Sequence, residues 1–255
     1  PATSKLETID YAYMCKLEGD LSLINSERVI TGPETAVFDS HTNLPSILPA
    51  LLPPSNREVR IAVNSKVMKL SWRLLEVCKR IEREATAPVR FSFFPGERHA
   101  WLDGLDAAIC AQLPSATVVP YVGYQRFLYE MCKCDMALAA FPFGNTNSTV
   151  DTCLLGLPTV VHFGPESPAQ TDWLVLKTAG LPRWLVCDND EDYFKTALRL
   201  VNDPSARTEA MGGLTRPQLY QALIKDQQRV SSEPFGEVIH QLYRHHDTIS
   251  ASPNR

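Results

Sequence analysis

The sequence predicts an α/β fold in which a parallel β-sheet is covered by helices on both faces. From about residue 58 onward, short runs rich in Val, Ile and Phe recur between turn residues, as buried strands do. Amphipathic helical patterns lie between these runs, and strands that alternate with helices pair in parallel. At 255 residues, 44% of them hydrophobic, the chain is long enough to bury a substantial core.

The runs expected to form the sheet follow one another along the chain. They are VRIAV (59–63), VRFSFF (89–94), ATVVPY (116–121), MALAAF (136–141), PTVVHF (158–163) and WLVC (184–187).

The helices expected between these strands show apolar residues at three- and four-residue spacing. In the first of them, at 71–84, Leu74, Val77 and Ile81 repeat in this way and Ser71 is a plausible N-cap. The other helical patterns lie at 101–113, 124–133, 148–156, 171–180 and 190–203.

We expect three regions along the chain. Residues 1–55 are less regular and end near the proline-rich stretch NLPSILPALLPPSN, which is typical of a stiff linker. The α/β domain is expected at 56–230, and residues 231–255 are expected to form a C-terminal helix and a tail. Helical patterns at 218–230, at the end of the α/β domain, and at 234–246 indicate two or more helices toward the C-terminus.

Composition narrows the function classes. The formal net charge is -4, so there is no basic excess to suggest nucleic acid as a partner. No segment reaches the roughly 20 apolar residues of a membrane span, and the N-terminus lacks a signal-peptide pattern. The seven cysteines mostly lie in apolar segments, which is typical of reduced, buried thiols. We therefore expect a soluble, cytoplasmic protein.

Several possible metal or catalytic signals are weak. Cys132 and Cys134 form a C-x-C, but no second Cys/His pair lies at zinc-site spacing. The D-x-D pattern at 188–190 precedes a helix, so acidic capping explains it better than a metal. His99 and His162 lie near strand ends, where a structural role is the commoner one. No metal site is expected, and the absence of G-x-G-x-x-G and G-x-x-x-x-G-K-[ST] argues against a dehydrogenase or a P-loop enzyme.

The loops that follow the strands are the places to look for a ligand, because open α/β sheets bind ligands beyond the carboxyl ends of their strands. In FPFGNTNSTVD (141–151), Asn147, Ser148 and Thr149 are expected to supply the N-cap and first turn of a helix, whose amides and dipole suit an anion. For an isolated cap, simple helix capping is the commoner explanation. Asp151 could accept from a vicinal diol or merely favour the helix dipole. Phosphate and diol together indicate a nucleotide.

Two further loops could complete such a site. Lys69, in the loop after the first strand, could place an ammonium near a diphosphate, although a solvated lysine is the alternative. In the loop VVPYVGYQRF, backbone groups around Gly123 could contact a base edge, and Tyr121 or Tyr124 could offer an aromatic face. Core tyrosines are the alternative explanation for this loop.

These residues resemble those of a known family. CDMALAAFPFGNTNSTVDTCLLGLPTV is similar to the donor-binding loop and helix of the cytoplasmic N-glycosyltransferases that modify bacterial adhesins, and more distantly of the O-linked N-acetylglucosamine transferases. VNSKVMKLS is similar to the family's lysine loop, PYVGYQRFLYEMCKCDM to its base-binding turn, and SSEPFGEVIHQLYRHH to its final helix. The resemblance spans nearly the whole chain.

The resemblance implies a fold and an activity. The family folds as two facing Rossmann-like domains, the GT-B type, so residues 56–230 would be the nucleotide-sugar-binding domain of the C-terminal half and residues 1–55 would come from the preceding domain. Its members are inverting, metal-independent enzymes that transfer a hexose or N-acetylhexosamine from a uridine diphosphate (UDP) sugar to Asn or Ser/Thr side chains of proteins. The UDP-sugar is a substrate, and no cofactor is implied.

The resemblance also implies roles for residues. Asn147, Ser148 and Thr149 would hold the diphosphate, Asp151 would take the ribose hydroxyls, and Lys69 would be the catalytic group that neutralises the departing UDP. The other residues expected in the nucleotide-sugar site are Lys66, Tyr121, Gly123 and Tyr124. Lys66 stands where the family often has Thr, and Tyr121 where it often has His, so the sugar and the base preference stay open.

The family's acceptor site lies largely in a preceding region that this chain does not match. The chain is therefore expected to be a C-terminal fragment that binds nucleotide and is weakly active or inactive by itself. A 2-epimerase-like enzyme and a degenerate, non-catalytic module that binds nucleotide or protein are the alternatives. The sequence leaves open the sugar, the acceptor, the oligomeric state and whether the native gene encodes the missing half.

Overall fold

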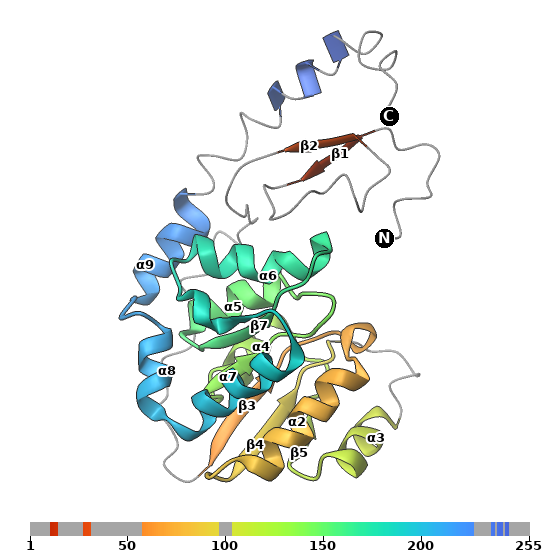
Figure 1. The fold of residues 1–255 in the computed structure, drawn as a ribbon, viewed down its shortest axis with the longest axis vertical. Helices are drawn as coiled ribbons and strands as arrows, with labels where there is room; N and C mark the ends of the chain where they lie inside the picture. The colour runs from red at the N-terminus through yellow and green to blue at the C-terminus, as the bar shows by residue number, and fades with distance from the viewer. Residues whose placement is uncertain are drawn as a thin grey trace.

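The main body of the protein is a six-stranded parallel sheet between two layers of helices (Figure 1). The computed structural model describes residues 58–96 and 104–226, together with two short strands near the N-terminus and residues 236–237, 239–241 and 243–244. The predicted fold class, a Rossmann-like α/β sheet covered on both faces, is confirmed.

Each of the predicted strand runs contains a strand of this sheet. The strands are β3 (Val59–Val63), β4 (Val89–Phe93), β5 (Ala116–Val118), β6 (Met136–Leu138), β7 (Thr159–His162) and β8 (Val186–Cys187). β8 is shorter than predicted, because the first residues of its run form the 3-10 turn η5 (Arg183–Leu185).

The order of the strands creates one special position in the sheet. The order is β5-β4-β3-β6-β7-β8, and every neighbouring pair is parallel. The chain moves outward from β3 to β5 and then returns to place β6 on the other side of β3. The carboxyl ends of β3 and β6 therefore flank the point where the strand order reverses, which is where open α/β sheets bind ligands.

Helices cover both faces of the sheet (Figure 1). On one face α2 packs against α7, with α3 beside α2; on the other, α4, α5 and α6 pack in sequence. Their bounds are α2 (Trp72–Glu84), α3 (Leu105–Gln112), α4 (Tyr124–Met131), α5 (Asn147–Leu155), α6 (Ser167–Thr178) and α7 (Asp190–Asn202). Three short helices follow: α8 (Pro204–Ala210), α9 (Arg216–Tyr220), which packs against α5, and the π-helix η6 (Gln221–Lys225), which packs against α6.

The local predictions for these helices largely hold. Ser71 is the N-cap of α2, where its hydroxyl accepts a hydrogen bond from the Leu74 amide at 3.2 Å, and the apolar stripe of this helix is buried. The start of α6 was predicted wrongly, at residue 171. The helix begins at Ser167 because Pro168 lies in its first turn, where proline needs no amide partner.

The ends of the chain are described only in part. β1 (Tyr11–Met14) and β2 (Arg28–Thr31) pair in parallel as a separate two-stranded sheet. The predicted linker at 43–56 lies outside the described residues, so the domain boundaries stay a prediction. The described residues between 236 and 244 are helical, in agreement with the predicted C-terminal helix.

The core lies between the sheet and its two helical layers. The described cysteines, which exclude Cys15, are all free thiols. Burial raises the pKa of Cys134 and Cys153 to about 12, so these thiols are packing groups rather than nucleophiles. No helix in the described part of the chain combines the length and apolarity needed to cross a bilayer.

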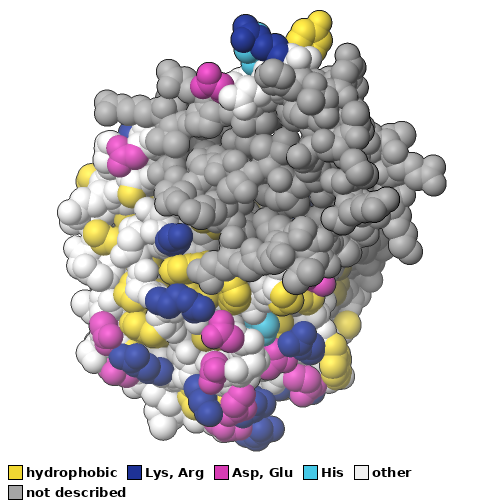
Figure 2. Space-filling model, turned by 45° about the horizontal axis from the view of Figure 1, so that its top comes forward, with side chains coloured by type: hydrophobic (Ala, Val, Ile, Leu, Met, Phe, Trp, Pro, Cys, Tyr) yellow, Lys and Arg dark blue, Asp and Glu magenta, His cyan; other side chains and the backbone are white. Residues whose placement is uncertain are grey.

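The described surface mixes charges of both signs. In Figure 2, Lys and Arg side chains lie among Asp and Glu side chains. Several charged side chains of the described residues pair directly, for example Arg80 with Glu191 at 2.8 Å and Arg199 with Glu209 at 2.7 Å. The described residues on this face therefore do not present the continuous basic patch that is typical of nucleic acid binding.

Candidate functional site

Two of the predicted loops meet at the point where the strand order reverses. Asn64 directly follows β3, and 6% of its surface is exposed. It contacts the loop that follows β6. The Asn145 side-chain amide donates to the Asn64 main-chain carbonyl oxygen at 2.6 Å, and the Asn64 side-chain amide donates to the Ser148 carbonyl oxygen at 3.4 Å. The structure thus joins the loop 64–71 to the loop 139–146 that leads into α5.

Lys69 lies directly against the second loop. It ends the 3-10 turn η3 (Val67–Lys69), and its Nζ donates to the Gly144 carbonyl oxygen at 2.5 Å and lies 4.4 Å from the centre of the Phe143 ring. Burial lowers the pKa of Lys69, Asp172 opposes this, and Lys66 adds to it. An ammonium has three N–H donors, so the bond to Gly144 leaves capacity for an anion. Lys66 is exposed at the N-cap of η3.

The start of α5 differs from the prediction. The N-cap is Thr146, without a side-chain capping bond, and Asn147 is the first helical residue. Asn147 is therefore not the predicted N-cap, and this residue is exposed. The Ser148 amide donates to the Asn145 carbonyl at 3.4 Å and the Thr149 amide to the Thr146 carbonyl at 3.0 Å. Within the described residues, the Asn147 amide has no acceptor, so it is the first-turn donor that a ligand can use.

The backbone of this loop is held in an unusual shape. Thr146 has φ 48° and ψ -88°, the one non-glycine residue with positive φ among those described. For a β-branched residue such a conformation costs on the order of 1–3 kcal/mol and persists only where the surroundings enforce it. Gly144 is equally constrained, because a Cβ there would lie 2.8 Å from Asp172 Oδ2 and 2.9 Å from the Pro168 carbonyl oxygen.

Asp172, which the sequence analysis missed, enforces this shape. It lies on α6 with 1% of its surface exposed. Its Oδ2 accepts from the Asn145 amide at 2.8 Å, and its Oδ1 accepts from the Thr146 amide at 2.6 Å and the Thr149 hydroxyl at 2.8 Å. Burial raises the pKa of Asp172, while these three hydrogen bonds and Lys69 oppose the rise. The one signal in the sequence was a carboxylate on the apolar face of a helix.

This contact also changes the picture of Thr149. Its side chain is 1% exposed and its hydroxyl is bonded to Asp172. The hydroxyl thus faces the interior, and among the predicted diphosphate ligands Asn147 and Ser148 are the ones with exposed surface.

The third predicted loop reaches the same helix through Tyr124. Its hydroxyl donates to Asp151 Oδ1 at 2.5 Å, which joins the start of α4 to α5. Burial and the Asp151 charge both raise the pKa of Tyr124, so the phenol stays protonated and donates. Tyr121 is 45% exposed in the preceding loop, and Gly123 is the N-cap of α4. Tyr121 is therefore not a core tyrosine, and Tyr124 is half-buried.

The residues of the weak signals have structural partners. Asn189 is the N-cap of α7 and accepts from the Asp192 amide at 2.9 Å, which confirms the capping interpretation of 188–190. Asp190 accepts a two-pronged bond from Arg73, with Nε at 2.8 Å, and lies 3.1 Å from His162 Nε2. Among the described residues no three His, Cys, Asp or Glu side chains gather as a metal site requires. His99 lies outside the described residues.

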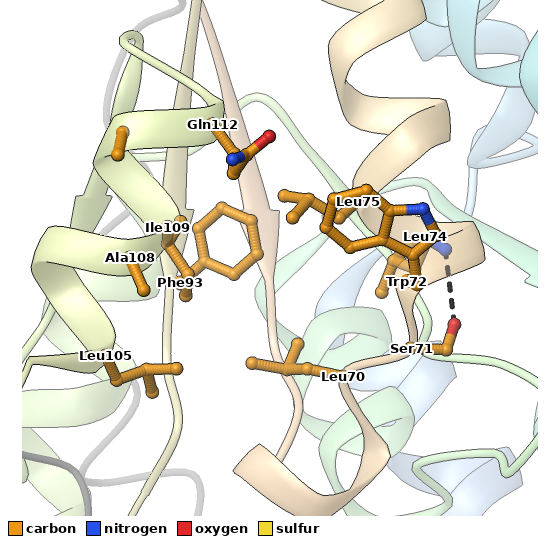
Figure 3. A pocket seen from close by; sticks show the side chains of 11 residues that line it. Leu70, Ser71, Trp72, Leu74, Leu75, Phe93, Leu105, Ala108, Ile109 and Gln112 are labelled. Carbon is orange, nitrogen blue, oxygen red and sulfur yellow. Dashed lines mark hydrogen bonds between the residues drawn. The ribbon is translucent and has the colours of Figure 1, made fainter.

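An apolar groove of about 430 Å³ lies between α2 and α3, next to the carboxyl end of β4 (Figure 3). Trp72, Leu74 and Leu75 of α2 form one wall, Leu105 and neighbouring residues of α3 form the other, and the Phe93 ring lies between the two helices. Such a lining offers almost no partners for phosphate oxygens, so the groove does not suit a diphosphate.

Curated relatives match most of this chain. The chain is 30% identical over 214 residues to the UDP-glucose:protein N-beta-glucosyltransferases of two Actinobacillus pleuropneumoniae strains, covering 82% of this chain and 34% of each relative. A shorter match, 33% identical over 69 residues, links it to the probable UDP-N-acetylglucosamine–peptide N-acetylglucosaminyltransferase SPINDLY of Petunia hybrida, covering 27% of this chain and 7% of that protein. No protein-family model matches the chain.

Solved structures share the fold. A mutant of the Thermobaculum terrenum O-GlcNAc transferase superimposes with a TM-score of 0.66 at 17% identity, over 93% of this chain and 44% of that one. Sucrose-phosphate synthase of Thermosynechococcus elongatus gives 0.51 at 10% identity, over 86% and 54%. At these identities the likeness concerns the fold alone, and it supports the predicted GT-B type of fold. The predicted resemblance is confirmed, and the chain spans about a third of the length of the curated relatives named first.

Proposed function

We propose that this relative of the protein N-glucosyltransferases binds a UDP-sugar where β3 and β6 end. In the whole protein it would serve as the donor-binding part of an inverting, metal-independent glycosyltransferase that modifies Asn or Ser/Thr side chains. One observation carries the proposal: Lys69 lies against the loop that opens α5, at the point where the strand order reverses.

The diphosphate would bind between Lys69 and the first turn of α5. The Lys69 ammonium, the Asn147 amide and the Ser148 side chain offer donors from two loops that hydrogen bonds hold together. Donors fixed before the reaction stabilise the charge that develops on the departing UDP. We propose that this arrangement takes the place of a metal ion.

The nucleoside would lie toward α4. An ionised carboxylate can accept several hydrogen bonds, so the bond from Tyr124 is compatible with a ribose diol on Asp151. Tyr121 is exposed beside Gly123 and would contact the base. In this arrangement Tyr124 orients Asp151, a finer role than the aromatic face predicted for it.

The alternatives explain the structure less well. A 2-epimerase-like enzyme needs acidic and histidine catalysts in its cleft, whereas His162 and Asp190 are engaged with each other and with Arg73. A module that only binds a protein partner has no need of an ammonium fixed beside a helix N-terminus.

The acceptor, the sugar and the compartment concern the whole protein. The UDP-sugar and an acceptor protein or peptide are the partners we propose. The free thiols among the described cysteines favour a reducing compartment, and the cytoplasm stays our proposal.

UDP binding, measured by calorimetry, tests the proposed function. Wild type should bind UDP, and Asp151→Ala should weaken binding by about 1–3 kcal/mol, the scale of lost hydrogen bonds to a charged group. Tyr124→Phe keeps the ring and the carboxylate but loses the hydrogen bond that orients Asp151, so its affinity should fall between the two. If wild type does not bind UDP, the proposed function is wrong. Equal UDP affinities for wild type, Asp151→Ala and Tyr124→Phe would show that Asp151 does not contact the nucleotide.

A further inference from the structure

Asp172 is a buried carboxylate that makes no contact with the nucleotide in the arrangement proposed above. It is the one acidic side chain that is buried among the described residues. Burying a charge is costly unless hydrogen bonds and an opposite charge compensate for it. Within the described residues, the hydrogen bonds that Asp172 accepts come from Asn145 and Thr146 in the loop that leads into α5 and from Thr149 in the first turn of that helix, so Asp172 and this segment depend on each other.

The chemistry of these hydrogen bonds requires an acceptor at residue 172. The Asn145 and Thr146 main-chain groups are N–H donors and cannot accept. A carboxylate can accept from both N–H groups, one with each oxygen. A side-chain amide in the same position would point its own NH2 group at one of these N–H donors, and two donors cannot form a hydrogen bond. The loop is therefore matched to a carboxylate and not only to a side chain of that size.

The strained residue of the loop is one of the groups that Asp172 holds. Thr146 donates its amide to Asp172, and its carbonyl accepts from the amides of Thr149 and Val150. Asn147, whose amide opens α5, comes directly after it. A change at Asp172 would release Thr146 from its positive φ and move the Asn147 amide with it.

Asp172 and Lys69 approach the same residue. Lys69 donates to the Gly144 carbonyl, and Asp172 Oδ2 lies 2.8 Å from the point where a Cβ of Gly144 would be. Among the described residues, Asp172 and Lys66 are the charged groups that act on Lys69, and Asp172 is the one that favours the protonated ammonium. In the same part of the chain, the titratable groups near Asp172 are Lys69, Cys153 and Tyr193, and the last two are neutral in this environment.

We propose that Asp172 is a positioning residue of the diphosphate site. Its carboxylate fixes residues 144–149 in the shape that presents the Asn147 amide, and its negative charge favours the ammonium form of Lys69 in the nucleotide-free protein. The identity of the ligand rests on the proposed function. The electrostatic effect of Asp172 on Lys69 does not, because it can be measured without a ligand.

The experiment compares Asp172→Asn with a matched control. Asp135→Asn is that control, because Asp135 Oδ2 also accepts a main-chain hydrogen bond, from Arg60 at 2.8 Å, but does so at the amino end of the sheet, directly before β6. Two quantities are measured on the full chain: the UDP dissociation constant by calorimetry, and the Lys69 pKa by NMR of the lysine side chains, assigned with Lys69→Arg.

Asp172→Asn should weaken UDP binding about tenfold or more, the effect of losing a hydrogen bond to a charged group, and should lower the Lys69 pKa further. Asp135→Asn should leave both quantities at their wild-type values, even if its melting temperature falls. A folded Asp172→Asn protein with unchanged UDP affinity and unchanged Lys69 pKa would overturn the proposal.

A second variant covers the case in which Asp172→Asn does not fold. Thr149→Val removes one of the three hydrogen bonds to Asp172 and keeps the charge. It should weaken UDP binding less than tenfold while the Lys69 pKa stays where it is, and wild-type affinity in this variant would refute the positioning role. If wild type does not bind UDP, the proposed function fails, while the Lys69 pKa still decides whether the Asp172 charge acts on the ammonium: an equal Lys69 pKa in wild type and in folded Asp172→Asn would show that it does not.

Discussion

Lys69→Ala is expected to weaken UDP binding about 10- to 100-fold, because a charged hydrogen bond to the diphosphate contributes about 1.5–3 kcal/mol. The fold should survive, since Lys69 is half-buried at the end of a short turn and lies outside the core. Calorimetry with UDP and with uridine separates the two halves of the ligand: the loss should appear with UDP and be absent with uridine. Lys66→Ala is the matched control, because Lys66 is exposed and should have a smaller effect.

The same lysine predicts a pH dependence. Burial lowers the pKa of Lys69 below its usual value of 10.5. A bound diphosphate favours the ammonium and raises that pKa again. UDP affinity should therefore be constant below the pKa of Lys69 in the nucleotide-free protein and fall as the pH rises through it. Lys69→Arg keeps its charge over this range, so an identical fall of affinity in that variant would show that another group titrates.

Gly144→Ala is expected to remove most of the UDP affinity without touching any group that contacts the nucleotide. Its Cβ would lie 2.8 Å from Asp172 Oδ2, 2.9 Å from the Pro168 carbonyl oxygen and 2.9 Å from Thr171 Oγ1. The first two atoms are fixed by hydrogen bonds and by the backbone, so the loop must move. Overpacking of this kind costs about 1–3 kcal/mol.

Thermal unfolding and UDP calorimetry measure this effect together. The melting temperature of Gly144→Ala should fall, and its UDP affinity should fall by more than about tenfold, because the Lys69 partner and the Asn147 amide both shift with the loop. Gly236→Ala is the control, since no atom of the described residues lies within 4 Å of a Cβ there. Normal UDP affinity in a destabilised Gly144→Ala protein would mean that the shape of this loop does not matter for binding.

Much of the architecture could be predicted because it depends on local patterns. Strands such as β3 and β7 are buried over most of their residues, so they appear as short runs rich in β-branched residues such as Val, Ile and Thr. The loop before α5 was visible because Gly, Asn, Ser and Thr accumulate there beyond the needs of a turn. The meeting of this loop with Lys69 then follows from the strand order.

The parts that were missed depend on contacts between distant segments. Asp172 is 26 residues from Thr146 along the chain, and nothing near it in the sequence shows that it faces a loop. The positive φ of Thr146 is enforced by that contact, so threonine's own preferences predict the opposite conformation. The true N-cap of α5 was missed for the same reason.

The most direct test of the central claim is a crystal structure of the protein soaked with UDP. The account predicts pyrophosphate oxygens about 2.7–3.2 Å from Lys69 Nζ and from the Asn147 amide nitrogen, with the ribose hydroxyls on Asp151. Nucleotide density in the apolar groove between α2 and α3, or at the amino end of the sheet, would contradict it.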